Sequence, residues 1–276
     1  MDRAVVLEDA RAGLLQELIE DRGQAIRPVF QPIVALRTGT TVAYEALARG
    51  PAGTALAMPE AMFGYAACVH RAQELDWACR AAACRHALSA RLPRRVPLFV
   101  NAEPSSARIR PPPQLLPELE AAARRLSIVV ELTERSLTGD TAAVLEAAEA
   151  VRRRGMLIAL DDVGADPAGL EMMRLLHPEI IKIDRSVVHG CGTPAARAVV
   201  AAVRAQACRS GAVIVAEGIE TACHLKVARW IGASLGQGWL LGRPGPLPAR
   251  FAQRDPVFDI EPADPAVACG ADTPAG

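Results

Sequence analysis

The sequence has no excess of charge of either sign. Lys+Arg and Asp+Glu both number 31 in a chain of 276 residues, so the formal net charge is zero. Proteins that bind duplex nucleic acid are usually basic, so no nucleic-acid polymer is expected as a partner. A small phosphorylated ligand is compatible with this balance, because a metal ion can neutralise it locally.

Paired cysteines and long apolar runs are also missing. The seven cysteines include no C-x-x-C pair and their number is odd, which indicates buried or incidental thiols in a reducing compartment. The N-terminus begins MDRAVVLEDARAG, with early acids and no long apolar run, so it is not a signal peptide. No stretch approaches the roughly 20 apolar residues that span a bilayer. We expect a soluble, cytoplasmic protein without a membrane segment.

Short apolar runs are abundant instead, and they alternate with helical stretches. Hydrophobic residues make up 51% of the chain, enough for one large core. Several runs are apolar on both faces, which is typical of parallel strands buried on both sides. The expected strands are 28–34, 41–47, 97–101, 127–132, 156–161, 180–183, 212–216 and 234–241. This count and alternation predict an α/β fold, a TIM-like (β/α)₈ barrel.

The first two expected strands depart from that barrel. A turn signal separates them at 37–40, so they should form a hairpin and make one strand antiparallel. We expect an N-terminal helix within residues 1–23, the barrel over 24–250, and a largely disordered tail over 251–276, which is rich in Pro, Asp, Ala and Gly. The helix could serve as a linker or dimer element, or pack on the barrel.

Acidic residues stand where the expected strands end. In such barrels the active site lies at the C-terminal mouth, so these acids should converge on one small volume. Unpaired carboxylates that close together repel and raise each other's pKa, and divalent cations relieve the conflict. Oxygen ligands suit Mg²⁺ and Mn²⁺, and no Cys/His set has zinc spacing. The five carboxylates of this predicted metal site are Glu45, Glu131, Asp161, Asp162 and Glu217.

Asp161 and Asp162 are adjacent, which creates a geometric problem. Neighbouring side chains of a strand point to opposite faces, so both can serve one site only if the chain leaves strand geometry there. Val163-Gly164 permits such a turn. Paired metal ions about 3.5–4 Å apart are a recurrent device for phosphoryl displacement. The acids therefore predict a divalent-metal site for phosphodiester chemistry.

Short motifs stand in a fixed order at the ends of the expected strands. They are Gln31-Pro32-Ile33, Glu45-Ala46-Leu47-Ala48-Arg49, Asn101, Glu131-Leu132-Thr133-Glu134, Asp161-Asp162, Lys182-Ile183-Asp184, Glu217-Gly218-Ile219-Glu220 and Gln237-Gly238. This set, which runs from about residue 24 to 250, resembles the EAL-domain family of cyclic di-GMP phosphodiesterases. Each motif alone is a weak signal, whereas the ordered set at strand ends is a strong one.

The resemblance implies a role for each matching residue. Four positions bind one Mg²⁺ or Mn²⁺ in the family: Glu45, Asn101, Glu131 and Asp161. Asp161 and Asp162 match the residues that hold a second ion. Three positions act on the attacking water, by positioning it, deprotonating it or supporting the arrangement: Lys182, Glu217 and Gln237. Three more match two substrate contacts and an acid that anchors the loop after the fifth strand: Gln31, Arg49 and Glu134.

The implied activity is metal-dependent hydrolysis of cyclic di-GMP to linear pGpG, which lowers the level of this second messenger. Homodimers are plausible from the family. The loop at 163–170 departs from the pattern, because the family usually has Phe after the two aspartates and then Gly-Tyr-Ser-Ser. The complete metal and base set favours an enzyme. The altered loop favours the alternative, a receptor or interaction module that binds cyclic di-GMP with little or no hydrolysis.

Overall fold

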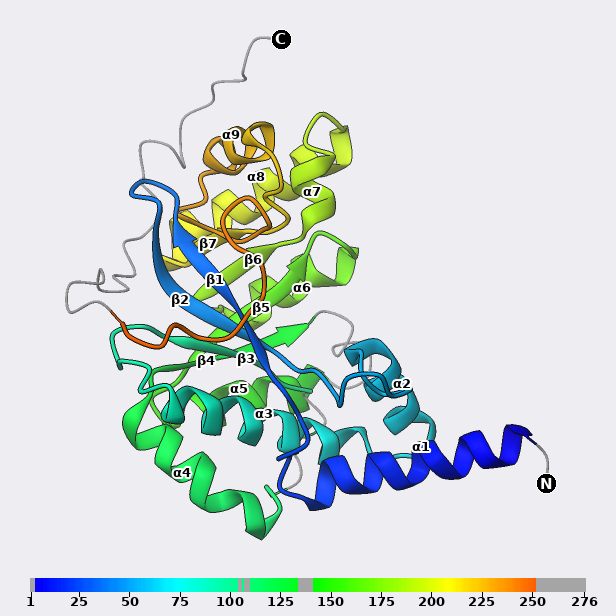
Figure 1. The fold of residues 1–276 in the computed structure, drawn as a ribbon. Coiled ribbons are helices and arrows are strands. Elements are labelled where there is room, and N and C mark those ends of the chain that lie inside the picture. Colours follow the sequence, from blue (N-terminus) through cyan, green and yellow to red (C-terminus); the bar gives the residue numbers. More distant parts are fainter. Residues whose placement is uncertain (1–2, 104–105, 107–109, 134–140, 252–276) are drawn as a thin grey trace.

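The chain forms a closed barrel of eight strands, each hydrogen-bonded to its neighbours in chain order (Figure 1). A computed structural model describes residues 3–103, 106, 110–133 and 141–251. The strands are β1 (Val29–Ala35), β2 (Thr40–Leu47), β3 (Leu98–Asn101), β4 (Ile128–Thr133), β5 (Leu157–Val163), β6 (Ile180–Ile183), β7 (Val213–Ala216) and β8 (Leu235–Gly236). The predicted α/β barrel is confirmed.

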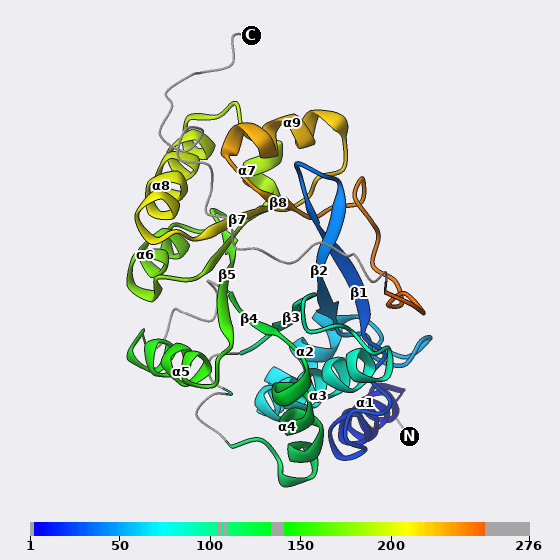
Figure 2. The same ribbon diagram turned by 90° about the vertical axis from the view of Figure 1, so that its left-hand side faces the viewer.

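Helices surround the strands on the outside of the barrel (Figure 2). They are α1 (Arg3–Glu20), α2 (Pro59–Cys68), α3 (Ala72–Ser89), the 3₁₀ helix η2 (Pro113–Leu115), α4 (Leu116–Arg125), α5 (Thr141–Arg153), α6 (Pro167–Leu176), α7 (Arg185–His189), α8 (Pro194–Ser210) and α9 (Ala222–Ile231). Most of them connect two parallel strands, which need a crossover of a dozen or more residues.

β1 runs against both of its neighbours. It pairs antiparallel with β2 across a turn that contains Gly39, and antiparallel with β8 on its other side. All other neighbouring strands pair in parallel. The predicted hairpin is confirmed. Because β1 is reversed, its N-terminal end lies at the mouth where the other strands reach their C-terminal ends.

Two apolar cores lie on the two sides of the sheet. The inner cluster is built from strand residues such as Phe99, Val129 and Ile180. The outer cluster combines strand residues such as Val100 with helix residues such as Val203. Successive side chains of a strand point to opposite faces, so each strand feeds both cores. This is why the strands read as continuous apolar runs.

The N-terminal helix α1 lies against α2 and α3 (Figures 1 and 2). Leu15 and Leu18 of α1 are buried in one cluster with Met62 of α2 and Leu75 of α3. Of the roles left open by the sequence, packing on the outside of the barrel is therefore observed. The tail at 252–276 lies outside the described residues. None of the helices in the described ranges is long and apolar enough to span a membrane.

Candidate metal centre and catalytic site

The candidate site is the topmost layer of the barrel interior. On each strand, the site residue lies two positions closer to the mouth than an apolar residue of the inner core. Side chains on one face of a strand recur every second residue, so this spacing turns all of them inward. The residue pairs are Ile33 and Gln31, Ala43 and Glu45, Phe99 and Asn101, Val129 and Glu131, Ala159 and Asp161, Ile180 and Lys182, Val215 and Glu217, and Leu235 and Gln237.

A bulge in β5 brings the second aspartate to the same layer. Asp162 has a left-handed backbone, with φ of 57°, and the register between β5 and β6 shifts between Leu160 and Val163. A bulge inserts one extra residue and re-aims its side chain. The predicted departure from regular strand geometry is confirmed, and it lies at Asp162 itself. The strand resumes after this bulge: β5 ends at Val163, whereas we expected it to end at Asp161.

The altered loop after Asp162 is compact. Ala165 N donates to Asp162 O at 3.1 Å, and the Asp166 carboxylate caps the start of α6 by accepting from Ala168 N at 2.8 Å. Gly164 has φ of 103°, and a Cβ there would lie 2.6 Å from a Val187 methyl carbon. The loop therefore depends on a glycine at this position.

Gly164→Ala should lower the free energy of unfolding by about 2–4 kcal/mol, through the left-handed backbone and the overlap with the outer core. Gly155→Ala is the matched control, since Gly155 also has positive φ, at 72°, but nothing within 4 Å of the added carbon. It should lose only about 1–2 kcal/mol, the cost of the left-handed backbone alone. Urea denaturation measures both values, and equal losses would contradict the packing argument.

Lys182 lies at the centre of the acidic layer and is only 1% exposed. Its ammonium nitrogen is close to four carboxylates: 2.6 Å from Glu131, 2.8 Å from Glu217, 2.9 Å from Asp161 and 3.5 Å from Glu45. Burial alone would lower the pKa of Lys182, but these acids together raise it well above its usual value. One fixed positive charge thus faces four acids.

Two amide side chains complete the layer. Gln237 Nε2 donates to Glu45 Oε2 at 2.6 Å, which fixes one oxygen of that carboxylate. Asn101 Nδ2 lies 3.5 Å from Glu45 Oε1 and 3.3 Å from Glu131 Oε2, at the long end for hydrogen bonds. An amide binds a metal ion through its oxygen. A half-turn of the Asn101 amide would bring Oδ1 to the present position of Nδ2, where it could serve as a metal ligand.

The negative charge of the layer is not fully compensated by the protein. Burial, with the charge of Glu45 added, raises the pKa of Glu131 well above its usual value despite Lys182. Burial raises the pKa of Glu217 to about 8, against the attraction of Lys182, and Asp161 adds to the rise. Glu131 Oε1 and Asp161 Oδ1 lie 2.6 and 2.9 Å from the Lys182 ammonium, and the described residues give these two buried oxygens no other partner.

These features fit divalent cations bound by oxygen. Two groups of carboxylates have ligand atoms within 4.8 Å of one another: Glu45, Glu131 and Asp161, and then Asp161, Asp162 and Glu217. Asp161 belongs to both groups, as expected of a ligand that bridges two ions. All donors are hard oxygens, which suits Mg²⁺ or Mn²⁺. Added positive charge would also relieve the raised pKa values of Glu131 and Glu217.

Glu45→Ala should weaken Mn²⁺ binding by about 10-fold or more, because it removes one carboxylate of the first group and the partner of Gln237. The exposed Glu60 on α2 provides a control of equal charge, and Glu60→Ala should bind Mn²⁺ as the wild type does. Isothermal titration with Mn²⁺ measures both affinities. Unchanged binding by Glu45→Ala would exclude Glu45 as a ligand.

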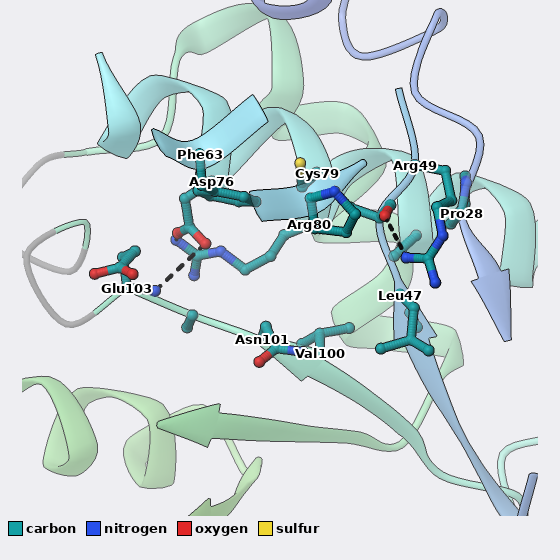
Figure 3. A pocket seen from close by; sticks show the side chains of 15 residues that line it. Pro28, Leu47, Arg49, Phe63, Asp76, Cys79, Arg80, Val100, Asn101 and Glu103 are labelled. Atoms are coloured by element: carbon teal, nitrogen blue, oxygen red, sulfur yellow. Dashed lines mark hydrogen bonds and ion pairs between the residues drawn. The ribbon is translucent and has the colours of Figure 1, made fainter. Parts of the chain in front are cut away.

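Of the two predicted substrate contacts, Gln31 belongs to this layer and Arg49 lines the neighbouring pocket. Gln31 donates through Nε2 to Gly242 O at 3.2 Å, which ties β1 to the segment after β8. Arg49 is half-buried and donates to Ala48 O at 2.7 Å. Figure 3 shows Arg49 on one side of a pocket and Asn101 on its floor. The predicted loop anchor Glu134 lies outside the described residues.

The pocket has a volume of about 260 Å³ and adjoins the metal centre through Asn101. Its far wall is formed by α3, with Asp76 and Arg80, and by Glu103 in the segment after β3 (Figure 3). Sequence reasoning did not single out these three residues. The available signal was Asp76 itself, a charged residue four positions before an arginine on an alanine-rich helix whose other inward residues are apolar.

Comparison with known proteins agrees with this geometry. A profile of the EAL domain family matches residues 13–244. The cyclic di-GMP phosphodiesterase NbdA of Pseudomonas aeruginosa is 31% identical over 229 residues, covering 80% of this chain and 29% of that protein. RocR, a cyclic di-GMP phosphodiesterase of the same organism, is 30% identical over 223 residues, covering 79% of this chain and 57% of that protein.

Among solved structures, BlrP1 of Klebsiella pneumoniae in complex with calcium and cyclic di-GMP superposes with a TM-score of 0.68 at 29% identity. The match covers 88% of this chain and 66% of BlrP1.

The closed α/β barrel with an acidic layer at its mouth places the protein among metal-binding barrel domains. The chain belongs to the EAL domain family. It spans about a third, or less, of the length of the first curated relatives that it matches.

Proposed function

We propose that the protein hydrolyses cyclic di-GMP to linear pGpG with two Mg²⁺ or Mn²⁺ ions. The observation that carries this proposal is the pair of carboxylate groups that share Asp161. The names of NbdA and RocR, and the metal and cyclic di-GMP in the BlrP1 complex, support the same substrate and ions. Five residues would hold the ions, with Asp161 common to both: Glu45, Asn101, Glu131, Asp161 and Asp162.

Two divalent ions at this position would lower the pKa of a bound water and stabilise the attacking and leaving oxygens. The remaining steps fall to side chains of the chain. Glu217 takes the proton of the attacking water, because its carboxylate lies in the same group as Asp161 and Asp162. Lys182, 2.8 Å from Glu217, holds that carboxylate in place. Gln237 fixes Glu45 by its 2.6 Å hydrogen bond.

Substrate binding is assigned to the rim. Arg49 offers a guanidinium, which pairs well with a phosphodiester, and Gln31 offers an amide. The water oxygen forms a bond to phosphorus as the bond from phosphorus to the 3′ oxygen breaks. The leaving oxygen takes a proton, and one turnover leaves a 5′ phosphate and a 3′ hydroxyl on pGpG.

A receptor that binds cyclic di-GMP without turnover is the second candidate. The observation in its favour is the altered segment at 163–170, which lacks the aromatic and hydroxyl residues usual in the family. Against it stands the bulge, because Asp162 still joins the second carboxylate group. We rank the enzyme first for that reason.

One assay separates the two functions. Purified protein is incubated with cyclic di-GMP and Mg²⁺ or Mn²⁺, and the products are separated by chromatography. Formation of pGpG that stops on addition of a chelator supports the enzyme. Binding without any product would leave the receptor, and absence of binding would remove both.

We further propose a barrel unit at 24–250 and a homodimeric, cytoplasmic protein, both resting on the family resemblance. Light scattering coupled to gel filtration measures the assembly state directly. A monomer at micromolar concentration would contradict the dimer and would leave the hydrolytic proposal untouched.

A further inference from the structure

Asp76 is a charged residue buried on the barrel side of α3, with only 2% exposure. Burying a carboxylate is costly unless it is paired and hydrogen-bonded. Its pairing begins with Arg80 one turn later, whose Nη2 lies 2.5 Å from Asp76 Oδ2. The Arg80 guanidinium in turn stacks 3.6 Å above the Trp77 ring. The pair is therefore held rigidly on the helix.

Both carboxylate oxygens of Asp76 reach the segment that leaves β3. Oδ1 accepts a hydrogen bond from Glu103 N at 3.3 Å, and Oδ2 lies 2.6 Å from Ser106 Oγ. The Ser106 hydroxyl also accepts from Arg80 and lies 2.6 Å from Glu103 O. Figure 3 shows Asp76 and Arg80 facing the backbone at Glu103. A helix is thus fastened to a strand exit by one carboxylate.

Asn101 ends β3 only two residues before Glu103, and its own contacts are weak. Its amide nitrogen lies 3.5 Å from Glu45 and 3.3 Å from Glu131, and its side chain is exposed at the mouth. On the barrel side the chain is fixed by Ala102 N donating to Glu131 O at 2.9 Å. On the outer side, the described contact that fixes this backbone is the one with Asp76.

We propose that Asp76 is a positioning residue of the metal centre, which sets the direction of the chain after β3 and so the placement of the Asn101 amide. The proposal rests on the proposed function in that it takes Asn101 as a metal ligand. Groups behind metal ligands commonly change metal affinity by 10–100-fold when they are removed. Asp76 is such a group acting through the backbone.

The first test is the affinity of Asp76→Asn for Mn²⁺, measured by isothermal titration. The variant keeps the size of the side chain but replaces the carboxylate by a neutral amide. The ion pair with Arg80 and the charged hydrogen bond with Ser106 are therefore lost. We expect Mn²⁺ to bind about 10-fold more weakly. The Mn²⁺ concentration for half-maximal hydrolysis should rise accordingly, whereas kcat at saturating Mn²⁺ should stay within about twofold of the wild-type value. Glu74→Gln is the control, because Glu74 lies on the same helix but pairs with Arg71 at its start, and it belongs neither to the pocket lining nor to the carboxylate groups.

A second test separates positioning from a merely structural role. If Asp76 acts through Asn101, its effect on Mn²⁺ affinity should disappear when Asn101 is already alanine, because effects within one network are not additive. A structural effect would instead lower Mn²⁺ affinity by the same factor in both backgrounds, and that result would overturn the proposal. Unchanged Mn²⁺ affinity in folded Asp76→Asn would overturn it as well.

Ser106→Ala provides a milder variant in case Asp76→Asn does not fold. It removes the hydroxyl that donates to Asp76 and leaves the Asp76–Arg80 pair intact. We therefore expect a Mn²⁺ affinity between those of the wild type and Asp76→Asn. Wild-type affinity in Ser106→Ala together with a non-folding Asp76→Asn would contradict the proposal. Failure of the wild type itself to bind Mn²⁺ would instead refute the proposed function, which keeps the two outcomes distinct.

Discussion

Glu217→Gln should reduce hydrolysis of cyclic di-GMP by about 10²–10⁴-fold, the usual contribution of a general base. The amide keeps the shape of the side chain but cannot take a proton. Lys182 would still face the group at the distance of 2.8 Å seen for the carboxylate. The comparison is made in single-turnover assays at saturating Mn²⁺, with pGpG quantified by chromatography.

The same variant distinguishes a base from a metal ligand, because Glu217 also belongs to the second carboxylate group. A base predicts Mn²⁺ and substrate affinities within about threefold of the wild type. A ligand predicts a loss of Mn²⁺ affinity of about 10-fold or more. Glu220→Gln is the control, since Glu220 is exposed three residues later, and it should keep full activity. Turnover surviving in Glu217→Gln would remove the base assignment.

Lys182→Met should produce the largest loss of stability in the metal-free protein. The substitution leaves four neighbouring carboxylates without their buried counter-charge. Breaking a buried ion pair from one side commonly costs about 3–5 kcal/mol. Lys226→Met removes the chain's other lysine, on the exposed side of α9, and should change little. Urea denaturation with a chelator present measures both variants.

The pH dependence of that loss has a definite sign. The pKa of Glu217 is raised to about 8 from an ordinary value of 4.5, so the folded protein binds more protons than the unfolded chain between these values. Stability from this group is present below about pH 4.5 and is lost as the pH rises toward 8. Without Lys182 the repulsion grows, so the deficit of Lys182→Met should shrink on acidification. A deficit that widens at low pH would contradict this account.

Divalent ions should compensate part of the same loss. An ion that binds only the folded protein stabilises it by mass action, and it also neutralises the acids that Lys182 no longer faces. Saturating Mn²⁺ should therefore raise the stability of Lys182→Met more than that of the wild type. Hydrolysis should still be impaired, because Glu217 has lost the group that holds it.

The inward layer could be predicted from the sequence because strand geometry is regular. Glu131, for example, follows the run 128–130, and its position two residues after Val129 fixes the face on which it lies. The reversal of β1 followed from the turn around Gly39. Local pattern and periodicity were sufficient for these features.

Other features depend on contacts between distant parts of the chain. The continuation of β5 past Asp161 requires pairing of Val163 with Ile183, which no local pattern reveals. The central place of Lys182 among four acids arises only when the barrel closes. Asp76 was missed because its partners, Ser106 and the backbone of Glu103, lie about thirty residues away on another element. The signal available was the spacing of Asp76 four residues before an arginine on an alanine-rich helix.

Anomalous diffraction from crystals grown with Mn²⁺ and cyclic di-GMP tests the central claim most directly, because it locates each ion against named oxygens. We predict two peaks about 3.5–4 Å apart. One should lie within ligand distance of Glu45, Asn101 and Glu131, and the other of Asp162, with Asp161 between them. A single peak, or peaks away from these carboxylates, would contradict the account.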